Sequence, residues 1–292
     1  MIDETAAEIE TMQTHSSSVV AIRAAEALGT LAEREYPAVG EFRRTLERNS
    51  EALRRANPSH ASLQTTQREI VAAVDEADPD SVAAAKDRLQ AAVTAVIDRI
   101  EASKDAAAGA AADLLADGTT LLTHDYSTTV LGAIERARED DRELTAYVTE
   151  ARPRYLGRKA ARRLAELGVE TRLIVDGAAG EYLPECDRVL LGMDCIADGY
   201  LYNRVGTYPI AATAADIGVP VTVVGSAAKL VAEGFSFEND HRVASEVLRE
   251  PAEGFTVENP AYDATPVDLL EEVVTDDGRV NPATLTDETA GR

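Results

Sequence analysis

The chain has 292 residues, a formal net charge of −23 and 45% hydrophobic residues, which suffices for one large domain or two ordinary ones. Such an acidic excess disfavours direct binding to nucleic acid, because contact with phosphates needs a basic face. No apolar run is long enough to cross a bilayer, and residues 1–5 lack the basic and apolar segments of a signal peptide, so we expect neither a membrane partner nor secretion.

The positive charge comes almost entirely from arginine, because lysine occurs at only four positions. An acidic surface poor in lysine is typical of a halophilic protein, in which cytoplasmic salt screens the repulsion between acidic groups; an ordinary acidic protein is the other interpretation. The two cysteines, Cys186 and Cys195, lack the spacing of a redox or zinc site, so no metal is expected. A reducing cytoplasm is the predicted location.

Residues 1–116 are predicted to form a helical domain. Apolar residues recur there at intervals of three and four, as at Leu89 and Val93, whereas the β-branched runs typical of strands are almost absent. Proline interrupts this pattern at 57–58 and at 78–79. We expect one helix to end and another to begin at each of these breaks.

Residues 117–282 are predicted to form a Rossmann-like α/β domain. Short apolar runs alternate there with amphipathic helices, which is the pattern of a parallel sheet. The expected strands cover residues 119–123, 144–148, 171–175, 188–191 and 220–224. Polar side chains follow the carboxyl ends of these strands, and in an open α/β sheet that edge holds the ligand crevice. Residues 283–292 are polar and are expected to form a disordered tail.

Residues 190–207 carry the strongest functional signal. Asp194 follows a predicted strand, the Asp-Gly pair at 198–199 is a hairpin signal, and a helix is expected to start after Gly206. The first N–H groups of that helix could hold an anion. The other interpretation is a strand, a hairpin and a helix with a charged rim. Neither a Gly-rich dinucleotide fingerprint nor a Walker A loop is present, so no cofactor is expected.

This stretch resembles the signature Gly-Ala-Asp…Asn-Gly…Asn-Lys-Ile-Gly-Thr of one superfamily, with Met193, Asp198 and Arg204 replacing its Ala, Asn and Lys. The superfamily contains the alpha, beta and delta regulatory subunits of eukaryotic initiation factor 2B, methylthioribose-1-phosphate isomerase and ribose-1,5-bisphosphate isomerase. The similarity covers residues 117–282, including an Asn-Pro-x-x-Asp-x-Thr-Pro motif at 259–266, and continues more weakly upstream. It implies a Rossmann-like domain that follows a helical one.

The resemblance implies that two groups move protons in the isomerases: the aspartate of Gly-Ala-Asp and a cysteine after the first strand. Asp194 matches the aspartate, and Asp125 stands at the cysteine position. The surrounding residues 123–127 are similar instead to the Thr-His-x-Tyr-Ser of the initiation-factor subunits. Cys195 is expected to point away from Asp194, because successive residues near a strand end face opposite ways.

Two upstream fragments also resemble the isomerases. The Ile-Arg-Ala-Ala that contains Arg23 is similar to their Ile-Arg-Gly-Ala. In a second fragment, Asn57 replaces an arginine that contacts substrate phosphate in the isomerases. Arg54 and Arg55 lie close in sequence, and two interpretations stay open: one of them substitutes for that arginine, or both are ordinary surface residues.

The predicted function is therefore that of an initiation factor 2B-like regulatory protein that binds a phosphorylated sugar or nucleotide. The alternative is an aldose–ketose sugar-phosphate isomerase with Asp194 and Asp125 as catalytic residues, and a third option is a structural paralogue with an inactive crevice. The resemblance implies a homodimer or higher oligomer through the C-terminal domain, with subunits of translation initiation factor 2 as partners in protein biosynthesis. The predicted ligand-binding residues are Arg23, Thr123, His124, Ser127, Arg152, Asn203, Arg204, Gly206, Thr207 and Lys229.

Overall fold

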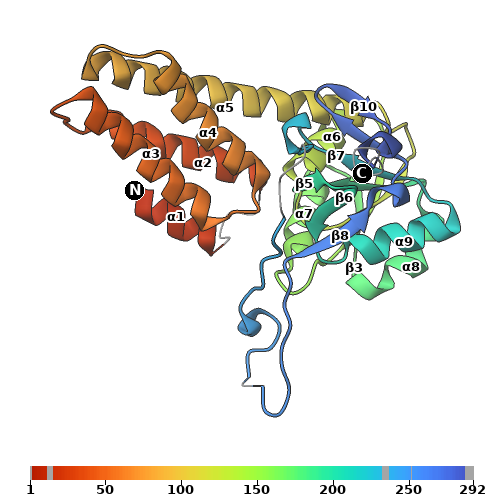
Figure 1. The fold of residues 1–292 in the computed structure, drawn as a ribbon. Coiled ribbons are helices and arrows are strands. Elements are labelled where there is room, and N and C mark those ends of the chain that lie inside the picture. The colour runs from red at the N-terminus through yellow and green to blue at the C-terminus, as the bar shows by residue number, and fades with distance from the viewer. Residues whose placement is uncertain (1, 12–15, 232–236, 251, 287–292) are drawn as a thin grey trace. The chain divides into compact units, whose positions relative to one another are not determined.

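The computed structural model describes residues 2–11, 16–231, 237–250 and 252–286. The chain divides into two compact units, Met1–Ala102 and Ser103–Arg292 (Figure 1). The first is helical and the second is built on a largely parallel sheet, which confirms the predicted α/β class. The division falls inside helix α5 (Val82–Ala112), whereas the sequence changes its pattern at residue 117, where the strands begin.

The helical unit surrounds one apolar core. Helices α3 and α4 end just before the proline breaks of the sequence pattern, and α4 begins after His60, whose ring accepts a hydrogen bond from Leu63 N–H at 3.1 Å. Full burial of a large apolar side chain contributes about 1.5–3 kcal/mol, so the core drives the packing of these helices. The core includes Leu28, Phe42, Leu46, Leu53, Leu63, Ile70 and Leu89. The elements are α1 (Ile2–Glu10), α2 (Ser17–Gly29), η1 (Thr30–Glu33), α3 (Val39–Ala56), α4 (Ala61–Glu76) and the first part of α5.

The C-terminal unit contains a seven-stranded sheet in the order β10-β9-β7-β4-β1-β2-β3, which is parallel except for β10. Its strands are β1 (Thr120–Thr123), β2 (Thr145–Thr149), β3 (Glu170–Ile174), β4 (Arg188–Gly192), β7 (Val221–Val224), β9 (Glu272–Thr275) and β10 (Gly278–Val280). The five strands expected from the sequence all lie within one residue of their predicted bounds.

Helices cover both faces of this sheet. Neighbouring residues of a strand point to opposite faces, so each strand packs against helices on both sides. Leu121 packs with helices α6 (Thr128–Glu139) and α7 (Leu156–Glu166). Leu122 packs in the cluster that contains α8 (Ala179–Tyr182) and α9 (Thr207–Ile217). Burial on both faces is what a parallel sheet requires.

A second sheet and an extended arm complete the C-terminal unit. The sheet joins β5 (Cys195–Ala197), β6 (Tyr200–Arg204) and β8 (Tyr262–Pro266) in antiparallel fashion, and the β5–β6 pair confirms the predicted hairpin. Between β7 and β8 the chain leaves the sheet as an arm, residues 237–250 and 252–261 (Figure 1). The two limbs of the arm pair at its base, where Arg242 N–H donates to Asn259 O at 2.8 Å.

The C-terminal end of the described chain forms the 3-10 turn η7 (Pro282–Leu285), in which Leu285 packs against the core. The tail predicted from residue 283 thus begins with a packed turn, and residues 287–292 lie outside the described residues. The other 3-10 turns of this unit are η2 (Asp176–Ala178), η3 (Leu183–Glu185), η4 (Ala227–Lys229), η5 (Ala244–Glu246) and η6 (Val267–Leu269).

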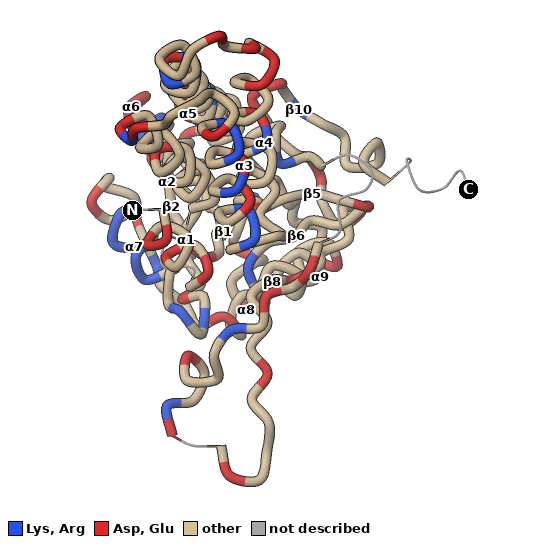
Figure 2. Tube along the Cα trace, turned by 60° about the vertical axis from the view of Figure 1, so that its left-hand side comes forward, with Lys and Arg blue, Asp and Glu red and all other residues tan. Residues whose placement is uncertain are grey.

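The distribution of charge differs along the chain. Acidic residues are spread over both units, and α7 carries four basic residues (Figure 2), at positions 158, 159, 162 and 163. In the part of the chain that the structure describes, no helix has the length and apolar character needed to span a membrane.

Candidate functional site

The candidate site lies at the carboxyl edge of the large sheet, between the neighbouring strands β1 and β4. From β1 the chain continues to β2 on one side, and β4 has β7 as its neighbour on the other. In open α/β sheets ligands bind where the strand order switches in this way. Asp125 follows β1 and Asp194 follows β4, so both predicted catalytic carboxylates lie at the switch point.

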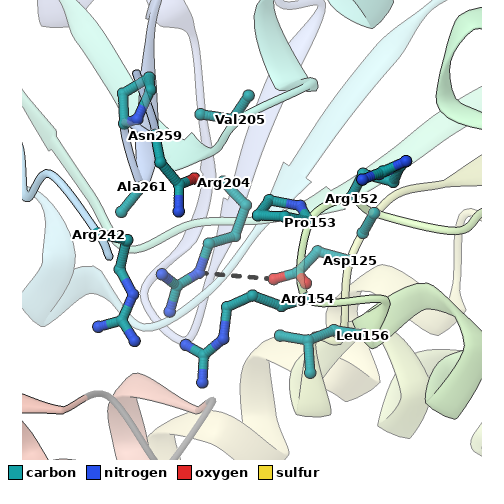
Figure 3. A pocket seen from close by; sticks show the side chains of 12 residues that line it. Asp125, Arg152, Pro153, Arg154, Leu156, Arg204, Val205, Arg242, Asn259 and Ala261 are labelled. Atoms are coloured by element: carbon teal, nitrogen blue, oxygen red, sulfur yellow. Dashed lines mark ion pairs between the residues drawn. The ribbon is translucent and has the colours of Figure 1, made fainter. Parts of the chain in front are cut away.

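A pocket beside Asp125 is lined by four arginines (Figure 3). One side, which we call the strand wall, consists of Asp125, residues 151–154, Leu156 and residues 204–205. The other side, the arm wall, consists of Arg242 and residues 259–261. The space inside is about 30 Å³, enough for roughly one or two water molecules. The arginines are Arg152, Arg154, Arg204 and Arg242.

Asp125 and Asp194 share the guanidinium of Arg204. Arg204 Nε lies 3.6 Å from Asp125 Oδ2 and 3.9 Å from Asp194 Oδ2, and the three side chains are at most 20% exposed. Burial raises the pKa of Asp125 above its ordinary value, and Arg204 opposes this shift only in part. Asp125 therefore keeps a proton more readily than an exposed carboxyl does. Asp194 does not line the pocket and is connected to it through Arg204.

Arg204 is held as a cation at the centre of this group. Burial by itself would lower the pKa of Arg204, but Tyr262 and the two carboxylates more than offset that effect and raise it. The guanidinium carbon also lies 4.8 Å from the centre of the Tyr262 ring. A cation that cannot lose its proton here can stabilise negative charge on a bound molecule.

The loop after β2, which carries Arg152, has uncommon backbone dihedral angles. Ala151 and Tyr155 have φ values of 57° and 58°, and Asp125 has a φ of 65°. Residues other than glycine reach this region at a cost of about 1–3 kcal/mol, and such residues cluster at functional sites. Asp176 stabilises the loop, since its two carboxylate oxygens accept hydrogen bonds from Ala151 N–H and Arg152 N–H, both at 2.7 Å.

Arg152 differs from the other pocket arginines, each of which has a carboxylate within ion-pair distance. No described carboxylate lies that close to Arg152, whose Nη2 donates to Val247 O at 3.5 Å. Its guanidinium carbon lies 5.4 Å from the centre of the Tyr155 ring. Arg152 is therefore the pocket arginine most available to an incoming anion.

The arm wall is organised around the carboxylate of Glu246. Its Oε1 accepts from Arg242 Nη2 at 2.9 Å, and its Oε2 accepts from Arg242 Nε at 3.4 Å and from Asn259 Nδ2 at 3.2 Å. Arg154 Nε lies 3.8 Å from Glu246 Oε1. Burial by itself would raise the pKa of Glu246, but Arg242, Asn259 and Arg154 hold it below its ordinary value. Glu246 is thus a charged group that connects the arm to the strand wall.

His124, a predicted ligand-binding residue, is buried and contacts protein atoms through both ring nitrogens. Nε2 lies 2.8 Å from the Val205 carbonyl oxygen and therefore donates to it, while Nδ1 lies 2.6 Å from Thr149 Oγ1. A Cβ on Gly206 would come within 2.6 Å of the ring, and Gly206 has a φ of 111°, so only glycine fits there. His124 thus fixes the segment that leads into α9.

Four further predicted residues are also engaged within the protein and do not line the pocket. Asn203 Nδ2 donates to Thr207 Oγ1 at 2.9 Å, and both side chains are buried. Ser127 begins α6 by accepting a hydrogen bond from Val130 N–H at 3.3 Å. Thr123 is buried at the end of β1. These residues shape the edge of the sheet around the pocket.

The start of α9, predicted to hold a ligand anion, already holds a carboxylate of the protein. Asp263 Oδ2 accepts hydrogen bonds from Gly206 N–H at 2.8 Å and from Tyr208 N–H at 3.0 Å. A helix N-terminus favours a negative charge, and here Asp263 supplies it. The position expected for a phosphate is therefore occupied by the side chain of Asp263.

Three other residues complete the comparison with the sequence. Lys229 is buried, its Nζ donates to Met193 O at 2.8 Å, and burial lowers its pKa against the opposing effect of Asp194. Burial raises the pKa of the Cys195 thiol to about 12, so this thiol stays protonated. Arg23 belongs to the helical unit, where its Nη1 lies 3.0 Å from Glu8 Oε2. Among the described residues, no three His, Cys, Asp or Glu side chains are grouped to bind a metal ion.

The sequence model of the Initiation factor 2 subunit family matches residues 13–282. The chain belongs to this family. The match confirms the resemblance that residues 190–207 indicate, and it extends well upstream of them into the helical unit.

Proteins with different names are similar to the chain. Ribose 1,5-bisphosphate isomerase of Haloterrigena turkmenica is 35% identical over 300 residues, which cover 96% of this chain and 90% of that protein. The protein of the same name from Haloferax volcanii is 32% identical and covers 97% and 90%. Among solved structures, translation initiation factor eIF-2B of Pyrococcus horikoshii OT3 has a TM-score of 0.82 at 27% identity, over 97% of this chain and 98% of that chain.

Sequence reasoning found part of the pocket and missed the rest. Of the predicted residues, Asp125, Arg152 and Arg204 line it. The sequence could have indicated Arg154, because it follows Arg152 by two residues in the same loop at a strand end. It could also have indicated Asn259, which opens the Asn-Pro motif that the chain shares with the family. No sequence pattern indicates Arg242, because it lies in an irregular segment.

Proposed function

We propose that this chain binds a phosphorylated sugar in the pocket and converts it from an aldose to a ketose. The observation that carries the proposal is the approach of Asp125 and Asp194 to one guanidinium, beside a pocket lined by four arginines. Arginine binds phosphate oxygens through two parallel hydrogen bonds, and Arg152 is the most available of the four. The names of the relatives support a sugar bisphosphate, and ribose 1,5-bisphosphate is the first substrate to test.

For a ring-closed sugar 1-phosphate, the conversion needs two proton exchanges and no net gain or loss of atoms. Asp194 removes the proton from C2 of a sugar that extends from the pocket past Arg204, while the bond between C1 and the ring oxygen breaks. Asp125, which burial keeps readily protonated, gives its proton to that ring oxygen. Asp125 then accepts the proton of the O2 hydroxyl, and Asp194 returns its proton to C1, which yields the 2-ketose.

Arg204 assists both carboxyl groups in this scheme. Its Nε lies 3.9 Å from Asp194 Oδ2, and its positive charge faces the negative charge that develops on the substrate oxygens in the transition state. General acid–base catalysis of this kind contributes about 10²–10⁴-fold to a rate. The phosphate groups hold the sugar in place and take no part in the proton exchanges.

The test combines a binding measurement with a product assay. Ribose 1,5-bisphosphate should raise the melting temperature of the purified chain, as mass action requires, and ribulose 1,5-bisphosphate should appear by nuclear magnetic resonance. Asp194→Asn should still bind the sugar but form product at least about 100-fold more slowly. Binding without product would contradict the enzymatic part of the proposal.

A regulatory function without turnover is the second candidate. The observation that favours it is Asp125 itself, a carboxyl where the resemblance to the isomerases implies a thiol, and the buried Cys195 offers no replacement. In that function the pocket senses a phosphorylated sugar or nucleotide, and the chain acts through contacts with subunits of translation initiation factor 2. Stabilisation by sugar phosphates or nucleoside monophosphates without product, together with co-elution with those subunits, would support it over the isomerase.

We further propose that residues 117–282 form the interface of a homodimer or higher oligomer that functions in a salt-rich cytoplasm. The net charge of −23 supports a role for salt, because screening reduces the repulsion between acidic groups. Light scattering measures the oligomeric mass, and melting across a potassium chloride series measures the effect of salt. A monomeric mass, or a melting temperature that falls with added salt, would contradict the respective part.

A further inference from the structure

In the described conformation, the pocket is too small for a sugar phosphate. Its space of about 30 Å³ compares with about 300–1,000 Å³ for sites that hold small molecules. One wall must therefore move before a ligand can enter. The arm contacts the strand wall through residues 243–247, which we call the strap: Arg154 Nε lies 3.8 Å from Glu246 Oε1, and Arg152 Nη2 donates to Val247 O at 3.5 Å.

Glu246 of the strap is bound as a ligand anion would be. Its two oxygens contact Nη2 and Nε of Arg242 in a fork, and one of them also accepts from the Asn259 amide. This is the geometry in which a guanidinium binds a carboxylate or a phosphate. The strap itself is open to solvent, with Val243 63% and Val247 39% exposed, so little apolar packing resists its displacement.

Three of the four pocket arginines already contact carboxylates of the protein. Arg204 faces Asp125 and Asp194, and Arg242 faces Glu246 and, at 3.8 Å, Asp240. A phosphate that entered beside these groups would meet repulsion from the carboxylates as well as attraction to the arginines. Glu246 is the carboxylate of this group that contacts both Arg242 and Arg154, so its displacement frees two guanidinium groups for a phosphate.

We propose that Arg154, Arg242 and Asn259 form a phosphate subsite and that the Glu246 carboxylate of the strap takes the place of a phosphate there in the described conformation. A phosphate group of the ligand takes the place of Glu246 on Arg154 and Arg242. The strap then separates from the strand wall, and the pocket enlarges. This inference rests on the proposed binding of a phosphorylated ligand and does not depend on its turnover.

Amide hydrogen exchange of the strap tests the displacement. The N–H groups of Glu246, Val247 and Leu248 donate to carbonyls of the strap at 3.0–3.1 Å, so their exchange reports whether this turn is intact. Saturating inorganic phosphate should speed their exchange at least about threefold in the parent, compared with potassium chloride at equal ionic strength. Glu246→Gln should exchange at the fast rate without phosphate and bind inorganic phosphate about tenfold more tightly.

Glu250→Gln is the matched control, because it removes an equal charge from an exposed position of the same arm and should behave like the parent. Weaker phosphate binding by Glu246→Gln would overturn the proposal, since Glu246 would then align the arginines instead of competing for them. Unchanged or slower exchange of the parent strap in phosphate would overturn it as well. If phosphate speeds the exchange but ribose 1,5-bisphosphate gives no product, the enzymatic proposal fails and this inference stands.

Discussion

The two walls of the pocket both present arginines, but different interactions hold them. The strand wall carries Asp125 and Arg152 directly after strands of the sheet, and the two carboxylate oxygens of Asp176 fix the backbone at Arg152. The arm wall carries Arg242 on an irregular segment, where the Glu246 side chain holds the guanidinium. Backbone hydrogen bonds thus define the first wall, whereas a partly exposed ion pair defines the second.

Because of this difference, we expect the two walls to have different roles. Proton transfer needs groups that stay in place, and strand ends are the most rigid positions that the fold offers. Entry of a ligand needs a wall that can move, and a segment held by side-chain contacts separates more easily than one held by a sheet. Variants of the strand wall should therefore affect chemistry and stability, and variants of the arm wall should affect mainly affinity.

Removal of Arg204 should have the largest effect, because it leaves Asp125 and Asp194 without their shared cation. Loss of one partner from a buried ion pair costs about 3–5 kcal/mol, so Arg204→Ala should lower the free energy of unfolding by about 3 kcal/mol at neutral pH. Phosphate binding should weaken about tenfold, because Arg204 supplies one of the four positive charges that line the pocket. Urea unfolding and phosphate titration measure the two effects. Arg204→Lys keeps the charge and should recover most of the stability; an Arg204→Ala protein as stable as the parent would refute this account.

Asp125→Asn tests the chemistry of the strand wall alone. The carboxamide is close in shape to the carboxyl but has no proton to donate, so turnover of ribose 1,5-bisphosphate should fall at least about 100-fold. Binding of inorganic phosphate should change less than about threefold, because Arg152 and the arm wall are untouched. An assay of product formation measures the turnover, and calorimetric titration measures the phosphate binding. Turnover that survives in Asp125→Asn would mean that another group supplies the proton.

Asp176→Asn tests whether the backbone of the strand wall positions Arg152. An amide side chain has one acceptor oxygen, so one of the two N–H groups that Asp176 binds would lose its partner. We expect phosphate binding to weaken about tenfold, equivalent to about 1.4 kcal/mol. Asp187→Asn is the control, because Asp187 Oδ2 accepts from Thr120 N–H at 2.8 Å at the opposite end of β1. Equal weakening by both variants would show a general loss of stability instead of a positioning effect.

The pH dependence of stability should distinguish Asp125 from an ordinary surface carboxyl. Because its folded-state pKa is raised, Asp125 binds a proton more tightly in the folded protein than in the unfolded one. The contribution of protonated Asp125 to stability is therefore fully present below the ordinary pKa of a carboxyl group. This contribution is lost as the pH rises through the raised pKa of Asp125 in the folded protein. The free energy of unfolding of Asp125→Asn, relative to the parent, should therefore increase with pH across that window. A difference that stays constant with pH would mean that the pKa of Asp125 is not raised.

The fold could be predicted because its signals are local. The apolar runs of β1, β2, β3, β4 and β7, and the helix that starts at Thr207, can be recognised from short segments of sequence. Each of these strands is a short apolar run bounded by polar residues, so a single pattern of apolar residues identifies it along its whole length. The same local rule placed Asp125 and Arg152 correctly at the edge that holds the pocket.

The rest of the site depends on contacts that no local pattern encodes. Asp263 fills the start of α9 from 55 residues downstream, and nothing near Gly206 in sequence indicates this. Arg242 reaches the pocket because the limbs of the arm pair at residues 240–242 and 259–261, which is a long-range event in an irregular segment. Sequence patterns therefore predict the wall that the sheet builds and miss the wall that the arm builds.

The smallest effect is expected from Asn259→Ala, which tests the arm wall directly. Asn259 Nδ2 donates to Val243 O at 3.1 Å and to Glu246 Oε2 at 3.2 Å, so its contacts lie within the arm. Such bonds contribute about 0.5–1.5 kcal/mol each in net terms, and the Glu246 carboxylate keeps its contacts with Arg242 when they are lost. We therefore expect turnover within about twofold of the parent and phosphate affinity lower by about threefold, because one hydrogen-bond donor of the proposed phosphate subsite is missing.

The matched variant is Asn239→Ala, because Asn239 Nδ2 donates to Tyr262 O at 2.8 Å and ties the arm to β8 instead of holding the strap. It should slightly reduce stability and leave phosphate affinity unchanged. A loss of turnover greater than about tenfold in Asn259→Ala, with Asn239→Ala unaffected, would mean that the arm wall takes part in the reacting geometry. The division between a wall that performs chemistry and a wall that admits the ligand would then be wrong, because both walls would have to be in place before proton transfer could begin.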